Sequence, residues 1–349
     1  MQSFIQSIFG KKAPKQLRIL PQDVTIDLTP GQTLLEAALA NGIAYPHDCT
    51  VGTCASCKTR LKQGRVREAT PFGYTLSKAE LDAGYILACQ AVPRDELTVI
   101  EIDPLLAELP PVEQFAARIV ATEQLTHDIL KVTVQTDRPV HYVAGQYANL
   151  RVPGAARYRS YSFANAPQRK GRSILEFYIR KVPGGEFTEA LFRGELDDQP
   201  MEMEAPHGTF HLHGGAAPMM CIAGGSGLAP LVSILEHARV NRIKRDCTLL
   251  FGARTQDDLY QLKVISNIAS NWQGEFRFIP VLSHEPESSS WAGARGLVTE
   301  HIPAGFCEGA EGYLCGPPPM IDAAIARLAE HGIALETVFY DKFTDGRNP

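Results

Sequence analysis

Four cysteines in the first part of the chain have a spacing that suits iron chemistry. Cys49, Cys54 and Cys57 follow one another as C-x4-C-x2-C, and Cys89 follows further along the sequence. Two sulfide-bridged irons need four thiolates, and three of these can come from one tight loop of small residues. We therefore predict that these four cysteines bind a [2Fe–2S] cluster and that the protein transfers electrons one at a time.

Three other uses of these cysteines fit the sequence less well. Zinc ribbons favour two C-x2-C clips, and only one is found here. Disulfides are not expected, because the N-terminal segment does not resemble a secretory signal. A Rieske centre would replace two cysteines by histidines. His47 precedes Cys49 in the wrong order, and no C-x-x-H string occurs.

The composition is that of a globular protein with two or three domains. The chain has 349 residues, of which 44% are hydrophobic and 21% charged. The net charge of −5 and the lack of basic runs argue against nucleic-acid binding. No apolar stretch approaches the length of a membrane-spanning helix. We expect a cytoplasmic protein.

The patterns of apolar residues divide the chain into a cluster domain, a linker and two further domains. In residues 15–103, two alternating strands, a helix, the cysteine loop and a final strand at 97–102 predict a β-grasp ferredoxin domain. The proline-rich segment 104–113 is expected to be a linker.

The remaining residues change pattern near residue 215. Short alternating stretches in residues 114–214 predict an antiparallel β-barrel. The expected strands are 115–122, 129–135, 147–152, 161–164 and 175–180. In residues 215–349, apolar strands at 219–223, 248–251 and 276–282 alternate with helices at 228–240 and 259–270. This alternation predicts a doubly wound α/β domain, so that the whole chain combines α+β and α/β folds.

The barrel region holds a short motif that suits a flavin. Arg159-Ser160-Tyr161-Ser162 fits the R-x-Y-S motif, in which arginine offers a forked cation to a pyrophosphate and tyrosine stacks on the flavin ring. In the segment that follows, Gly184 and Gly185 would let backbone N–H groups approach a phosphate. The candidate residues there are Tyr178, Lys181, Val182, Gly184, Gly185 and Thr188. Each string alone is also compatible with an ordinary strand or turn.

Two turns of the α/β region suit a dinucleotide. Gly224, Gly225, Ser226 and Gly227 follow a strand and open a helix, where a pyrophosphate or nicotinamide meets backbone N–H groups. Pro230 replaces the third glycine of the usual G-x-G-x-x-G fingerprint. A second stiff turn, Cys315, Gly316 and Pro317, is expected beside the nicotinamide at the carboxyl ends of the strands.

With these motifs in this order, the chain resembles the reductase components of bacterial multicomponent oxygenases, such as those of benzoate dioxygenase and the phenol and methane monooxygenases. The resemblance implies that Arg159, Tyr161 and Ser162 bind FAD and that the glycine-rich turn and the Cys315 turn bind nicotinamide. The family ends near an aromatic–acid–x–Phe stretch beside the flavin. Here it reads Tyr340-Asp341-Lys342-Phe343, with Asp341 where glutamate is common. Ser162, Cys315 and Asp341 are the candidate catalytic residues, and Phe343 is a further cofactor contact.

The resemblance also implies the reaction. Hydride passes from NADH to FAD, and single electrons pass through the [2Fe–2S] cluster to an oxygenase or hydroxylase component that docks transiently on a monomeric reductase. Asp257 and Asp258 suit the ribose diol of NADH better than a phosphate, whereas Arg254 is the counter-argument.

The identity of the electron acceptor stays open in the sequence. A Rieske-type ring-hydroxylating dioxygenase is favoured, and a di-iron monooxygenase or a deoxysugar dehydrase would share the same motifs. A redox-sensing protein that holds flavin and cluster, or a metal-free structural protein, are alternatives of another class. We expect Thr50, Val51 and Thr53 to form a rim at which the acceptor docks.

Overall fold

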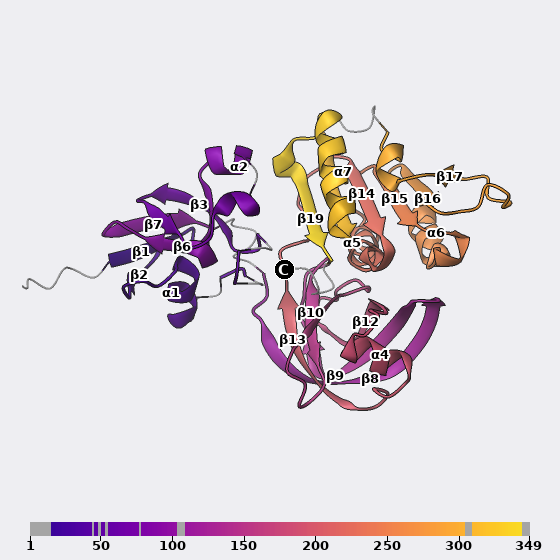
Figure 1. The fold of residues 1–349 in the computed structure, drawn as a ribbon, viewed down its shortest axis with the longest axis horizontal. Coiled ribbons are helices and arrows are strands. Elements are labelled where there is room, and N and C mark those ends of the chain that lie inside the picture. The colour runs from indigo at the N-terminus through magenta and orange to yellow at the C-terminus, as the bar shows by residue number, and fades with distance from the viewer. Residues whose placement is uncertain are drawn as a thin grey trace, which may run out of the picture. The chain divides into compact units, whose positions relative to one another are not determined.

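The computed structural model describes residues 15–43, 45–47, 50–52, 55–76, 78–102, 109–303 and 309–343. The described residues up to Leu109 form one compact unit, and those from Pro110 form a second. Cys49, Cys54 and Thr53 lie outside the described residues, as do parts of the predicted linker. Each unit is described by itself below (Figure 1).

The first unit is built on a five-stranded mixed sheet in the order β2-β1-β7-β3-β5. The bounds are β1 Lys15–Leu20, β2 Val24–Leu28, β3 Lys58–Gln63, β5 Tyr85–Leu87 and β7 Leu97–Glu101. β1 pairs antiparallel with β2 and parallel with β7. A two-stranded sheet of β4 (Val66–Glu68) and β6 (Ala91–Pro93) lies beside it. This arrangement is the predicted β-grasp fold.

One helix covers the core of this sheet, as the alternation of the first strand requires. Leu17 and Ile19 of β1 are fully buried, while Arg18 between them faces outward. Helix α1 (Leu34–Ala40) packs its apolar side into the same core. Thr33 and Glu36 form a reciprocal capping box that fixes where the helix begins. Three further short helices lie in the described part of the unit: η1 (Phe72–Tyr74), α2 (Lys78–Asp82) and η2 (Ala88–Gln90).

The first half of the second unit is a six-stranded antiparallel barrel in the order β11-β10-β13-β8-β9-β12. The strands are β8 Glu113–Thr126, β9 Ile129–Val140, β10 Tyr147–Arg151, β11 Arg159–Ser162, β12 Arg172–Arg180 and β13 Pro200–His207. A bridge between Phe163 and Phe177 closes the barrel. Helix α4 (Glu186–Phe192) contributes Phe187 and Leu191 to the barrel core.

The second half is a six-stranded sheet, parallel throughout, in the order β17-β16-β15-β14-β18-β19. The strands are β14 Met219–Gly224, β15 Cys247–Ala253, β16 Phe276–Leu282, β17 Ala294–Arg295, β18 Glu311–Gly316 and β19 Val338–Lys342. Since the strand order reverses between β14 and β18, the fold is doubly wound and a crevice opens at their carboxyl ends.

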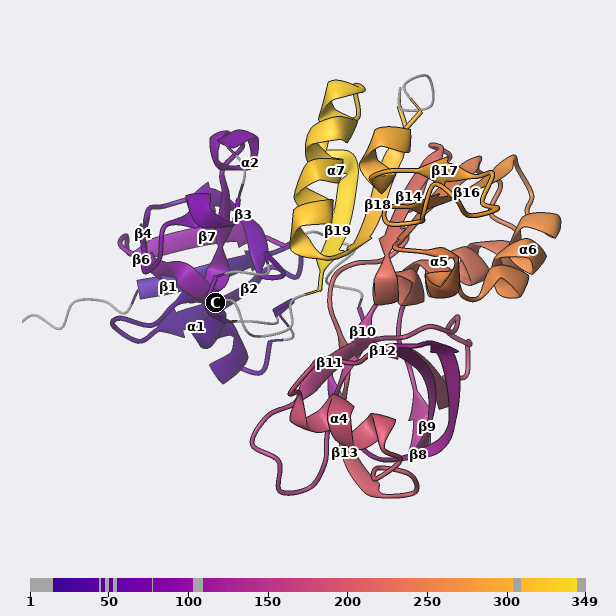
Figure 2. The same cartoon turned by 45° about the vertical axis from the view of Figure 1, so that its right-hand side comes forward.

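Helices cover both faces of this sheet (Figures 1 and 2). Cys221 and Phe251 pack on the side of α5 (Leu228–Val240) and α6 (Leu262–Ser270). Ile222 and Leu250 pack on the opposite side, against α7 (Pro318–Glu330). Neighbouring residues of one strand thus enter different cores, which explains why these strands read as continuous apolar runs rather than alternating ones.

Among the predicted boundaries that differ from the structure, two have a clear physical reason. The strand expected at 161–164 ends at Ser162, because Phe163 and Ala164 leave β10 and pair with β12 to close the barrel. The helix expected from residue 259 begins at Leu262, after Gln261 in the left-handed region. The stiff turn predicted at 315–317 is followed directly by α7, whose first residues are Pro318 and Pro319. No helix in the described ranges is both long and apolar enough to cross a membrane.

Candidate functional site

Two of the four predicted cluster ligands, Cys57 and Cys89, lie side by side in the core of the first unit. Cys57 precedes β3, and Cys89 lies in η2, which α1 helps to cover. The Cys89 backbone N–H donates to Cys57 Sγ at 3.5 Å. Both thiols are buried and neither forms a disulfide. An N–H···S contact between two ligand positions suits thiolates that share a cluster.

The loop that carries the other ligands has the strained backbone that a tight wrap requires. Thr50 and Ala55 adopt positive φ of 55° and 60°, and Gly52 adopts 88°. The Thr75 hydroxyl donates to the Gly52 carbonyl and fastens the loop to the segment after η1. Val51 on this loop is 61% exposed. The described part of the loop therefore fits a [2Fe–2S] site with an exposed edge.

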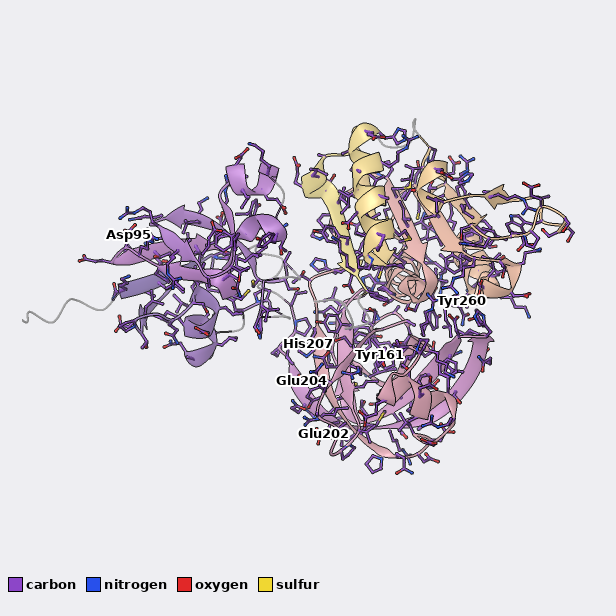
Figure 3. The ribbon with its side chains drawn as sticks, viewed as in Figure 1. Asp95, Tyr161, Glu202, Glu204, His207 and Tyr260 are labelled. Carbon is purple, nitrogen blue, oxygen red and sulfur yellow. The ribbon has the colours of Figure 1, made fainter. Side chains whose placement is uncertain are left out.

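The R-x-Y-S motif forms strand β11 of the barrel, directly before the bridge between Phe163 and Phe177. Arg159 and Tyr161 lie on one side of the strand, and the two serines lie on the other. The Tyr161 ring lies 5.5 Å from the Phe187 ring of α4, and burial raises the pKa of its hydroxyl (Figure 3). Ser160 donates to Asn149 on β10 at 2.7 Å, and Ser162 is buried.

The glycine turn between β12 and α4 gathers cationic and N–H donors near this strand. Lys181 Nζ lies 3.2 Å from a Glu189 carboxylate oxygen, and the Gly184 N–H donates to the same carboxylate at 3.4 Å. Lys181 also holds the pKa of Glu189 below its usual value. Thr188 accepts from the Val182 N–H at 3.0 Å and shapes the turn, while Gly185 is the N-cap of α4. Donors of this kind suit the pyrophosphate of FAD, and in this structure the Glu189 carboxylate accepts from them.

The two nucleotide turns of the α/β half meet directly. The first contains Gly227, in η3 (Gly225–Gly227) between β14 and α5. A Cβ added to Gly227 would lie 2.2 Å from the Cys315 carbonyl oxygen and 2.8 Å from the Gly316 nitrogen. Only glycine permits this approach of the two backbones. The contact brings together motifs that lie far apart in the sequence.

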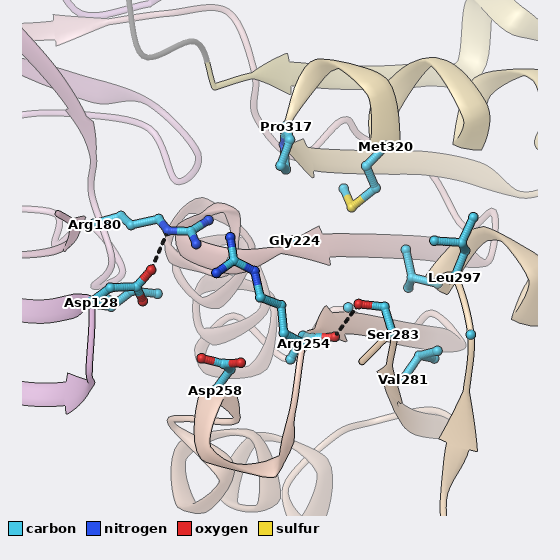
Figure 4. A pocket seen from close by; sticks show the side chains of 16 residues that line it. Asp128, Arg180, Gly224, Arg254, Asp258, Val281, Ser283, Leu297, Pro317 and Met320 are labelled. Atoms are coloured by element: carbon cyan, nitrogen blue, oxygen red, sulfur yellow. Dashed lines mark hydrogen bonds and ion pairs between the residues drawn. The ribbon is translucent and has the colours of Figure 1, made fainter. Parts of the chain in front are cut away.

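A cavity of about 250 Å³ lies above these turns (Figure 4). The predicted residues that line it are Gly224, Gly225, Arg254, Asp258 and Pro317. Residues not singled out from the sequence complete the wall. They are Asp128, Ile129, Arg180, Gly252, Ala253, Val281, Ser283, Gly296, Leu297, Val298 and Met320. Three of these come from the barrel, so that the cavity lies between the two halves of the second unit.

Charged groups of both signs face this cavity. Arg180 donates to Asp128 at 2.8 Å, and the Arg254 side chain points into the same space (Figure 4). The Asp258 carboxylate accepts from the Thr255 N–H at 3.0 Å and lies 3.3 Å from His127 Nδ1. Two guanidinium groups and the backbone of the glycine turn fit a dinucleotide pyrophosphate, and the carboxylates of Asp128 and Asp258 line the same cavity.

The C-terminal strand reaches the same turn. Asp341 of β19 lies in register with Cys315 of β18, and the Phe343 N–H donates to the Gly316 carbonyl at 2.9 Å. Burial raises the pKa of the Cys315 thiol well above its ordinary value, and the charge of Asp341 adds to this effect. Cys315 is therefore a neutral thiol at neutral pH.

The sequence analysis missed the residues that reach the cavity only because strands far apart in the sequence pair with one another. Asp128 and Arg180 lie at the end of the β9–β12 pairing, and only that pairing brings them to the cavity. Tyr260, labelled in Figure 3, also joins the two halves. Its ring meets the Tyr178 ring edge-on at 5.5 Å, and its hydroxyl donates to the Gly225 carbonyl at 2.9 Å. Tyr178 thus lies behind the cavity, at the junction.

Family models match all three regions. Residues 17–94 match the 2Fe-2S iron-sulfur cluster binding domain, residues 116–212 the oxidoreductase FAD-binding domain, and residues 221–325 the oxidoreductase NAD-binding domain.

Curated relatives match over almost the whole length. The chain is 42% identical to the xylene/toluene monooxygenase electron transfer component XylA of Pseudomonas putida, over 98% of both proteins. It is 34% identical to the phenol 2-monooxygenase reductase component DmpP of a Pseudomonas species, over 93% of both. The chain belongs to the reductase components of multicomponent oxygenases. It is an NADH-dependent oxidoreductase that carries FAD and a [2Fe–2S] cluster and delivers electrons to an oxygenase component.

Solved structures agree with this assignment. The Amycolatopsis cytochrome P450 reductase GcoB is 34% identical, with a TM-score of 0.73, and the match covers 95% of this chain and 99% of that one. The ferredoxin reductase in carbazole 1,9a-dioxygenase is 28% identical, with a TM-score of 0.66, over 95% and 98% of the two chains. In such proteins the flavin and the cluster supply the redox chemistry, and the protein binds and orients them.

Proposed function

We propose that this reductase delivers electrons from NADH to the hydroxylase component of a monooxygenase that acts on an aromatic hydrocarbon. The observation that carries the proposal is the 42% identity to a xylene/toluene monooxygenase component over 98% of both chains. Propane and phenol monooxygenase reductases are also relatives, at 32–34% identity.

A ring-hydroxylating dioxygenase of the Rieske type, which the sequence analysis favoured, is the second candidate. The similarity to the ferredoxin reductase in carbazole 1,9a-dioxygenase supports it. The acceptor itself binds the oxygenated substrate, so that the reductase sequence does not choose between a di-iron and a Rieske centre.

Reconstitution with two acceptors tests this choice. The reductase is mixed with NADH and xylene and either the hydroxylase component of a xylene/toluene monooxygenase or a Rieske-type oxygenase component with its own substrate. We expect hydroxylated product in step with NADH consumption for the first acceptor, and uncoupled NADH oxidation for the second. Coupled turnover with the Rieske component alone would overturn the proposal.

We further propose roles for the residues that the motifs single out. Arg159, Tyr161 and the turn at 181–188 hold FAD, and Ser162 contacts the flavin from the end of β11. The turns at 224–227 and 315–317, with Arg254 and Asp258, hold NADH, and Asp341 and Phe343 complete the flavin pocket. The donor sets around β11 and around the cavity support these roles. Cofactor contents of single variants test them one by one.

The same motifs define the domain limits that we propose for the chain. We propose a cluster domain at 15–103, a linker at 104–113, an FAD domain at 114–214 and an NAD domain at 215–349. The three family-model matches support these limits. We also propose that the reductase is a cytoplasmic monomer, in keeping with the unbridged state of the described cysteines. Cell fractionation and sedimentation of the purified protein test the two statements.

A further inference from the structure

Gln90 directs a side-chain donor at the fourth cysteine of the cluster site. Its Nε2 lies 3.6 Å from Cys89 Sγ and 2.9 Å from the Thr50 carbonyl oxygen. Because a carbonyl oxygen only accepts, the contact with Thr50 assigns the amide nitrogen, and not the amide oxygen, to the side facing the sulfur. The residue is 8% exposed, so that water competes little for this donor.

The surroundings hold Gln90 in this position. The Ala69 N–H donates to the Gln90 carbonyl at 2.8 Å and fixes its backbone. Gly52 lies against the side chain: a Cβ added at Gly52 would come within 2.7 Å of Gln90 Cγ. The amide is therefore fixed between the cysteine loop and the fourth ligand, and its direction does not depend on a flexible rotamer.

We propose that Gln90 is a positioning residue that raises the reduction potential of the [2Fe–2S] cluster. Reduction adds one electron to the cluster and increases the negative charge on its sulfurs. A donor to a thiolate sulfur stabilises the reduced state more than the oxidised state, and hydrogen bonds to sulfur are an established lever on such potentials. Gln90 thus makes the cluster a better acceptor of single electrons from the flavin.

A second contact in the same loop provides the matched control. The Thr75 hydroxyl donates to the Gly52 carbonyl, so that it anchors the loop as Gln90 does through Thr50. None of the interactions described for Thr75 involves a cysteine sulfur. If Gln90 acted only by anchoring the loop, loss of either anchor would have the same effect on the cluster.

The experiment compares Gln90→Met and Thr75→Val in the full-length holoprotein. Methionine keeps the unbranched shape that Gly52 requires and removes the donor, whereas leucine would branch at the crowded Cγ. Potentiometric titration, followed by the EPR signal of the reduced cluster, gives the potential. At the wild-type midpoint we expect the ratio of reduced to oxidised cluster to fall about three- to tenfold in Gln90→Met, tenfold being 59 mV for one electron. Gln90→Glu, which keeps the size and cannot donate when ionised, should shift the potential in the same direction.

Thr75→Val should leave the potential unchanged, and flavin reduction by NADH should keep its wild-type rate in both variants. An unchanged potential in Gln90→Met, or equal shifts in Gln90→Met and Thr75→Val, overturns the proposal. If a variant fails to bind its cluster, the proposal can still be tested by pulsed EPR of the wild-type protein. With glutamine side-chain nitrogens labelled with ¹⁵N, pulsed EPR of the reduced cluster should detect hyperfine coupling to the amide, and its absence also overturns the proposal.

Discussion

Gly227→Ala tests whether the two nucleotide turns must touch. The added methyl group would lie 2.2 Å from the Cys315 carbonyl oxygen, against about 3.4 Å for an ordinary contact, so that the turns must separate by about 1 Å. A misplacement of that size typically costs about 100-fold in the rate of a reaction between bound groups. The overpacking itself costs about 1–3 kcal/mol, and the Tm of the second unit should fall by about 2–4 °C for each kcal/mol.

The assay is anaerobic stopped-flow reduction of the flavin by NADH, with the rate measured across a range of NADH concentrations. Gly214→Ala is the matched control, because Gly214 lies in the same unit and nothing lies within 4 Å of the added Cβ. We expect a loss of about 100-fold in Gly227→Ala with normal FAD and iron contents, and wild-type behaviour in Gly214→Ala. Wild-type reduction in Gly227→Ala, or an equal loss in both variants, would refute the reasoning.

The other predictions concern flavin binding, acceptor docking and pH. Arg159→Lys keeps the charge but loses the forked donor, so the purified variant should contain less FAD and unchanged iron; a full complement of FAD would remove Arg159 from the flavin site. Val51→Glu should slow electron delivery to the oxygenase partner but leave the reduction of a small dye unchanged. Val240→Glu, at a position that is also 61% exposed, should leave both rates unchanged. An unchanged rate of delivery in Val51→Glu would exclude this docking site. Burial raises the pKa of the Cys315 thiol, so above pH 9.0 the unfolded chain loses a proton that the folded protein keeps. The free energy of unfolding of the second unit should therefore fall as the pH rises above that value, and this thiol contributes up to about 1.4 kcal/mol per pH unit to the fall. In Cys315→Ala the fall should be less steep, and measurement of Tm against pH checks both statements.

The sequence predicted the elements whose pattern is local. The parallel strands β14 and β16 and the helix α5 lie where their apolar runs placed them, because each is long and bounded by turn residues. The predicted helix of the cluster domain is likewise present as α1. The cysteine spacing predicted the cluster, and the family-model match at residues 17–94 confirms it.

What the sequence did not reveal depends on contacts between distant segments. Arg180 and Asp128 are ordinary charged residues until the β9–β12 pairing brings them together at the cavity. Gln90 follows a cysteine directly, yet its role depends on the loop that folds back over it. Asp258 was singled out as a ribose ligand, but its carboxylate also caps the short helix η4 (Gln256–Asp258). The sequence alone does not distinguish an aspartate that caps a helix from one that binds a ligand.

One measurement tests the central claim most directly: anaerobic absorbance titration of the purified protein with NADH, and separately with NADPH, together with iron and flavin analysis. The account predicts two irons and one FAD per chain, in keeping with a single cluster, and bleaching of both the flavin and the cluster bands at low NADH concentration. A flavin band that bleaches in a protein without a cluster band would contradict it. Cys49, Cys54, Cys57 and Cys89 would then have a structural role, and the protein would not be a single-electron carrier.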